Sequence, residues 1–197
     1  MTNQGAPLGS VHGTAQRAAD VLAVLLPRTG NRLSPGSVEE RAAVIDVLRA
    51  HGEPEPVEIS PASLELLRQA ALELREVFTA EDATAAATVI NSLLAGRAHP
   101  PRLTNHDGTS GWHLHVDSSD DALWGETILT SSCLALAVLL AERQAPPAGI
   151  CASPPCARPF VNVGRGAARR YCSAACGTRE RVAAHRETRH AAGDAPG

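Results

Sequence analysis

Four cysteines near the end of the chain constrain its fold more than any other feature. They follow the pattern Cys151-x4-Cys156-x15-Cys172-x3-Cys176. Two closely spaced pairs separated by a medium loop can place four thiolates around one tetrahedral Zn²⁺ ion. We therefore expect residues 151–190 to form a small module with one structural zinc ion, because the segment is too short to fold on an apolar core alone.

Other roles for these cysteines fit the pattern less well. A set of reduced thiols that binds no metal is one alternative. A redox dithiol is disfavoured because the segment contains no C-x-x-C pair. A catalytic zinc is disfavoured because four cysteine ligands leave no coordination position for water.

The residues around the cysteines predict a treble-clef-like arrangement. Two prolines between Cys151 and Cys156 bend the first pair into a knuckle. Residues 160–166 predict a short strand and a turn. Ser173 is a good helix N-cap, which places Cys176 in the first helical turn, where the helix dipole favours a thiolate.

Arginines are concentrated in the same segment. Residues 151–190 hold eight arginines and two acids, a net charge of +6, whereas residues 1–150 hold ten arginines and eighteen acids, a net charge of −8. This asymmetry indicates that the two parts have different partners, and a dense positive face favours nucleic acid. A solvated face, or an arginine stripe packed on the acidic N-terminal part, is the alternative. The candidate DNA-binding residues are Arg165, Arg169, Arg170, Arg179, Arg181, Arg186 and Arg189.

The upstream residues predict a helical domain with one β-hairpin. The chain is 44% hydrophobic and 3% aromatic, so its core is built from Leu, Val, Ile and Ala, which favours packed helices over a β-sandwich. Ser37, Ser60 and Ser118-Ser119-Asp120 are expected helix caps, and Asp107-Gly108 is a typical hairpin turn. Periodicity predicts helices at about 15–26, 38–50, 61–78, 82–94 and 118–143, and strands at 100–103 and 112–116.

These elements predict an α+β fold that is mostly α, with a helical N-terminal domain carrying a β-hairpin and a small treble-clef-like four-cysteine zinc finger. We expect the N-terminal domain to span residues 1–144. The Pro- and Gly-rich residues 145–150 are expected to be a linker, because two prolines and a glycine cannot continue a helix. The finger is expected at residues 151–190, followed by a disordered tail at 191–197.

The last cysteine opens the motif Cys176-Gly177-Thr178-Arg179. With it, residues 151–190 resemble the CGNR-type zinc finger, which is named for the residues at this point. The resemblance implies that the four cysteines bind zinc, that Gly177 and Arg179 are motif positions and that the finger binds DNA. Thr178 stands where the family has Asn, and it lacks the amide needed for a bidentate contact.

The N-terminal part resembles the α/β domain usually paired with this finger, described as a stress-induced transcription regulator. The similar residues are Leu74-Arg75-Glu76, Ile90–Leu94, Pro101-Arg102-Leu103 and Gly111-Trp112. The opening segment Asp20–Val24 does not reproduce the Asp-x-x-Asn-Thr-like sequence of that family.

A small-ligand site is a hypothesis for the N-terminal domain, since polar residues occur among its helical and strand signals. The candidate residues are Arg75, Asn91, Arg102, Trp112 and His113. For Asn91 and Arg102, structural hydrogen bonding is the preferred interpretation. His113 and His115 share a strand face, which fits a second metal site or, as we expect, an exposed polar face. Cys133, in an apolar helix, is expected to be a buried small hydrophobe.

The expected function is zinc-dependent, DNA-binding regulation of transcription, with an N-terminal domain that senses a small-molecule effector or dimerises. A single finger gives little specificity, which favours a homodimer. The alternative is a protein-interaction module with a structural zinc clip. An enzyme is less favoured, because no Ser/His/Asp or Cys/His set has a supporting local context.

The sequence also predicts a compartment. No apolar run reaches the roughly 18 residues of a membrane span. The opening residues lack a basic stretch followed by an apolar one, so we expect no signal peptide. We therefore expect no membrane association and a place in the cytoplasm of a bacterium, where clustered cysteines are metal ligands rather than disulfides.

Overall fold

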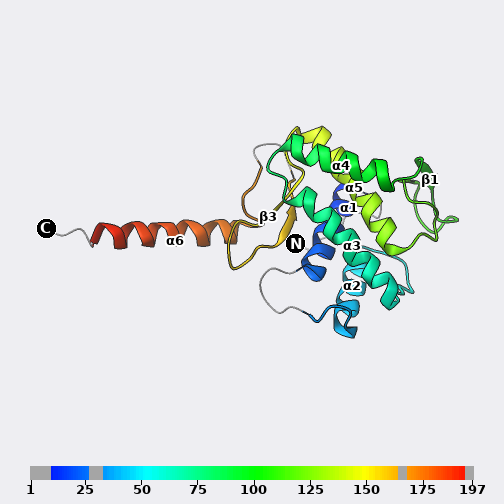
Figure 1. The fold of residues 1–197 in the computed structure, drawn as a ribbon, viewed down its shortest axis with the longest axis horizontal. Coiled ribbons are helices and arrows are strands. Elements are labelled where there is room, and N and C mark those ends of the chain that lie inside the picture. Colours follow the sequence, from blue (N-terminus) through cyan, green and yellow to red (C-terminus); the bar gives the residue numbers. More distant parts are fainter. Residues whose placement is uncertain (1–9, 27–32, 164–167, 194–197) are drawn as a thin grey trace.

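The computed structural model describes residues 10–26, 33–163 and 168–193. In these residues the chain forms mainly helices, with two short antiparallel hairpins, so the predicted α+β, mostly α class is confirmed (Figure 1). The helices are α1 Val11–Leu25, α2 Val38–Ala50, α3 Pro61–Phe78, α4 Ala83–Arg97, α5 Trp124–Arg143 and α6 Ala174–Gly193. The strands are β1 Arg102–Thr104, β2 His113–His115, β3 Ala148–Ile150 and β4 Pro159–Val161.

The core lies around α5, against which α1, α3 and α4 all pack. Ile128 and Leu136 of α5 are fully buried, together with Leu67 of α3. Burying each such side chain contributes about 1.5–3 kcal/mol. By length and composition α5 could also cross a membrane, contrary to the expectation from the sequence. Half of its apolar stretch is buried inside the fold.

Helix starts are set by local caps, as predicted for α2 and α3. The side chains of Ser37, Ser60 and Asp82 accept hydrogen bonds from backbone N–H groups in the first turns of α2, α3 and α4. The predicted cap at 118–120 is wrong, because α5 begins at Trp124 without a side-chain cap. Asp120 is instead used by the adjacent hairpin, where it pairs with Arg102.

The first hairpin is confirmed. β1 pairs with β2 in antiparallel register, with Arg102 opposite His115 and Thr104 opposite His113. The connecting loop contains left-handed backbone at His106, Asp107 and Gly108, and only the glycine adopts this conformation without steric cost. The turn is closed by hydrogen bonds from the N–H groups of Gly108 and Ser110 to the carbonyl of Asn105, at 3.1 and 3.0 Å.

The segment predicted as a linker, residues 145–150, ends in β3, which pairs with β4. Ala148 and Val161 of this hairpin belong to the main apolar core and pack with α1 and α3. The side chain of Asn162 is buried and donates to the carbonyl of Pro146 at 3.0 Å, while its backbone N–H donates to Pro147 at 2.8 Å. The connection is therefore held by Asn162 at the two prolines and by the apolar core at Ala148.

The last helix, α6, extends away from the helical body (Figure 1). Its start is capped by Ser173, whose hydroxyl accepts from the N–H of Cys176 at 3.2 Å, as predicted. The helix continues to Gly193, so residues 191–193 of the expected disordered tail are helical. The rest of that expected tail, 194–197, lies outside the described residues.

Candidate metal centre

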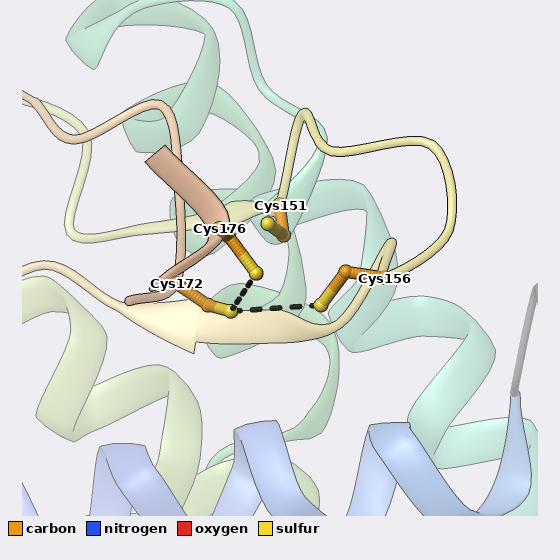
Figure 2. Close-up of side chains that lie close together, drawn as sticks. All are labelled: Cys151, Cys156, Cys172 and Cys176. Carbon is orange, nitrogen blue, oxygen red and sulfur yellow. Dashed lines mark hydrogen bonds between the residues drawn. The ribbon is translucent and has the colours of Figure 1, made fainter. Parts of the chain in front are cut away.

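The β3–β4 hairpin and the start of α6 bring the four cysteines together (Figure 2). Cys151 directly follows β3, and Cys156 lies in the loop before β4. Cys172 precedes α6, and Cys176 lies in its first turn. The knuckle is thus the loop of the hairpin itself. The predicted turn at 164–166 lies outside the described residues.

The sulfur positions fit one tetrahedral zinc ion. The Sγ atom of Cys172 lies 3.6 Å from that of Cys156 and 3.8 Å from that of Cys176, and all four sulfurs lie within 4.8 Å of one another. A Zn–S bond of about 2.3 Å gives tetrahedral S–S edges of about 3.8 Å. Four thiolates fill the coordination sphere, so the ion they hold is structural and stabilises the fold.

The thiols differ in how readily they ionise. A hydrogen bond from Ser173 lowers the pKa of Cys176 to about 7, whereas burial raises the pKa of Cys172 to about 12. Burial also raises the pKa of Cys156. Zinc binds thiolates, so filling the site must release protons, and its affinity falls as the pH falls.

Backbone and side-chain hydrogen bonds join the parts of the finger. The N–H of Cys151 donates to the carbonyl of Arg158, and the N–H of Ala152 to that of Arg170, each at 2.9 Å. The hydroxyl of Ser153, which is fully buried, donates to Glu180 on α6 at 2.6 Å. Glu180 therefore joins α6 to the loop that connects β3 and β4.

The motif residues after Cys176 have distinct local roles. Gly177 packs so closely on Tyr171 that an added Cβ atom would lie 3.3 Å from the ring. The hydroxyl of Thr178 accepts from Arg181 at 3.0 Å. Nη1 of Arg179 lies 4.0 Å from Sγ of Cys176, where its charge favours the thiolate. Arg179 thus lies beside the sulfur of the last cysteine, a position that its helical spacing did not reveal.

The other predicted DNA-binding arginines differ in their surroundings. Arg169 donates to the carbonyl of Val161 at 2.6 Å and lies over the ring of Phe160. Arg165 lies outside the described residues. The remaining six of the seven predicted residues are exposed: Arg169, Arg170, Arg179, Arg181, Arg186 and Arg189.

The structure does not bring the five predicted ligand-binding residues together. Arg102 and His113 lie on the first hairpin, and His113 lines a cavity of about 500 Å³. Arg75 lies instead beside the zinc finger, in a small gap that Ile150 also lines. Asn91 is exposed on α4, and 71% of Trp112 is exposed. Sequence periodicity predicts each helix or strand separately and does not indicate which of these residues lie close together in the fold.

The histidine face on β2 also differs from expectation. The side chain of His115 is only 14% exposed and contacts the buried carboxylate of Asp117, so an exposed polar face is wrong at this position. His106, which is not among the predicted site residues, lies against both His113 and His115. His106 follows Thr104, the strand partner of His113, by two residues. Its place in the predicted hairpin turn could therefore have indicated that it lies near His113. Cys133 is buried, as predicted.

Comparison with known proteins supports the zinc finger at the C-terminal end of the described residues. A comparison with curated proteins gives no match. The resemblance of the N-terminal part to a stress-induced regulator domain is not supported. Residues 148–189 match the family model of the CGNR zinc finger, and the four cysteines within them are positioned to bind one zinc ion.

Proposed function

We propose that this protein is a zinc-dependent, DNA-binding regulator of transcription. The observation that carries the proposal is the position of the exposed arginines on a zinc-organised helix that extends from the body. Arg181, Arg186 and Arg189 are all exposed on α6. Their partner is an anionic surface, because the helix that carries these cationic side chains extends away from the N-terminal part (Figure 1).

The shape of α6 suits a nucleic-acid groove. Twenty residues at 1.5 Å each give a helix about 30 Å long. The major groove of B-DNA is about 12 Å wide and admits one α-helix. Zinc fixes the first turn of this helix through Cys176, so the metal sets the orientation of the arginines beyond it. DNA affinity should therefore depend on zinc.

The N-terminal part supplies the regulatory input in this proposal. It contains the 500 Å³ cavity, a size typical of small-molecule sites. A small-molecule effector in this cavity, or a homodimer formed through this part, would bias the position of the finger, because β3 and β4 are packed into the same core. Such a regulator acts where bacterial DNA lies, in the cytoplasm.

A structural zinc clip is the second candidate function. Ala148 and Val161 belong to the main core, so the finger also covers apolar surface of the N-terminal part. A clip of this kind would hold the two parts together and present α6 to an acidic protein partner. It requires no affinity for DNA.

Binding of random duplex DNA at low salt separates the two functions. The regulator should bind only when loaded with zinc, and its affinity should fall steeply between about 50 and 200 mM salt. Arg186→Ala should weaken binding and reduce the salt slope by about one. A folded, zinc-loaded protein that binds no DNA at low salt would exclude the regulator and favour the clip.

A further inference from the structure

Three histidines converge beside the first hairpin, far in sequence from the cysteine centre. His113 and His115 come from β2, and His106 comes from the loop that precedes it. The ring centroids are separated by 4.8–5.1 Å. Nε2 of His113 lies 3.1 Å from Nε2 of His106 and 3.0 Å from Nε2 of His115. The three rings thus present the same nitrogen to one point.

These separations suit a transition metal. A Zn–N bond of 2.0–2.1 Å gives tetrahedral N–N edges of about 3.3 Å. The two measured contacts are within a few tenths of an ångström of this value, and the three ligand atoms all lie within 4.8 Å of one another. Small side-chain rotations would therefore complete the site.

The other ring nitrogen of each histidine faces an oxygen acceptor. Nδ1 of His115 lies 3.0 Å from both carboxylate oxygens of Asp117. Nδ1 of His113 lies 2.7 Å from the carbonyl oxygen of Gly111, and Nδ1 of His106 lies 3.4 Å from Oδ2 of Asp120. Metal-binding histidines commonly donate their second N–H in this way, which fixes the tautomer and orients the ring.

One tautomer of the three rings fits these contacts. When each Nδ1–H donates to its oxygen, each Nε2 carries a lone pair and no proton. Nε2 of His113 then lies 3.1 Å from that of His106 and 3.0 Å from that of His115 with no proton between them, and a cation among the three lone pairs converts their repulsion into coordination. Arg102 also lies 3.3 Å from Nδ1 of His115, but it donates to Asp117 at the shorter distance of 2.6 Å. It therefore reinforces the carboxylate that holds this ring.

All three histidines line the 500 Å³ cavity. Asp117, Leu134 and Val138 are also part of its lining, so the cavity is polar near the rings and apolar along α5. Zinc sites with three protein ligands keep their fourth position for water or a ligand, in contrast to four-cysteine sites. A fourth position here opens into space large enough for a small molecule.

We propose that His106, His113 and His115 bind a second zinc ion, whose open position takes water or an oxygen donor of a small molecule in the cavity. This site is independent of the cysteine centre and does not rest on the DNA-binding proposal. It gives the N-terminal part a specific chemistry, because a carboxylate or hydroxyl group on a small molecule can bind directly to the metal.

Zinc counting on the full-length, tag-free protein tests the proposal. Elemental analysis after dialysis against zinc-free buffer should give about two zinc ions per chain for the unaltered protein, and about one for His113→Ala and for His106→Gln. His99→Ala is the matched control, because His99 is 53% exposed and lies outside the cluster, and it should retain both ions. Circular dichroism should show unchanged helix content in all variants.

The cysteine centre provides the complementary measurement. Cys176→Ala should remove one ion and leave the histidine-bound ion in place. Cobalt replacement then distinguishes the sites, because thiolate-bound cobalt has an intense charge-transfer absorption that histidine-bound cobalt lacks. One zinc ion per chain that survives both histidine variants and disappears in Cys176→Ala would overturn the proposal, and it would leave DNA binding by the finger unaffected.

Discussion

The Nη1 atom of Arg179 lies 4.0 Å from the Sγ atom of Cys176, so the last residue of the Cys176–Arg179 motif faces the metal centre. Four thiolates around one Zn²⁺ ion carry excess negative charge, which this guanidinium partly neutralises. Arg186 lies two helical turns further along α6 and is exposed. Substitutions of Arg179 and Arg186 can therefore distinguish an effect on zinc binding from an effect on binding of a partner.

Arg179→Ala should weaken zinc binding by about 10- to 100-fold, the usual loss when an outer partner of a metal ligand is removed. Arg179→Lys should restore part of this affinity, because it keeps the charge. Competition with a chromogenic zinc chelator measures the effect. Arg186→Ala is the control, and equal zinc affinity in Arg179→Ala and Arg186→Ala would show that Arg179 has no role at the metal.

Removal of zinc should unfold the finger and leave the helical core folded. Structural zinc in small fingers contributes roughly 10–16 kcal/mol of apparent binding energy, whereas α3 and α5 are held by buried apolar side chains. Hydrogen exchange should accelerate in residues 151–163 and 168–187 after chelation, while α5 stays protected.

A cysteine outside the cluster gives the control for this experiment. Cys133→Ala removes a buried thiol of α5 and should keep the zinc of the finger, whereas Cys172→Ala should lose it. Protection of residues 151–163 that is unchanged by chelation would mean that packing against α1 and α3, rather than zinc, holds the hairpin.

Gly125 lets α5 approach α3 closely, because an added Cβ would lie 2.9 Å from the backbone of Leu66. Gly125→Ala should lower the free energy of unfolding by about 1–3 kcal/mol through overpacking. Gly96 on α4 has open space around it, and there the same substitution should raise stability by about 0.5–1 kcal/mol. Urea unfolding followed by circular dichroism measures both, and effects of the same sign would refute the packing argument.

Asn162 fastens the second hairpin to the connection that precedes it. Its side chain donates to Pro146 and accepts from the N–H of Arg169, and its exposed fraction is 1%. Asn162→Ala leaves buried groups without partners and should cost about 1–3 kcal/mol in urea unfolding. Asn91→Ala, on the exposed face of α4, should change stability by less than about 0.5 kcal/mol. A similar loss of unfolding free energy in Asn162→Ala and Asn91→Ala would mean that the hydrogen bonds of Asn162 do not stabilise the fold.

Local patterns predicted much of this structure. Ser37 and Ser60 begin their helices as expected, because a cap acts within one helical turn. The cysteine ligands were also predictable, since tetrahedral coordination restricts their spacing to a few patterns. The failed cap at 118–120 shows the limit, because Asp120 pairs with Arg102 across the hairpin instead.

The sequence by itself determined the helical class, the first hairpin and the set of thiolates that can hold zinc, because these depend on neighbouring residues and on coordination geometry. Only the tertiary structure decided that Ala148 and Val161 join the main core, that Arg179 faces Cys176 and that His106 meets His113 and His115. These relationships depend on which surfaces pack together. Packing joins residues distant in sequence, whereas periodicity describes one element at a time.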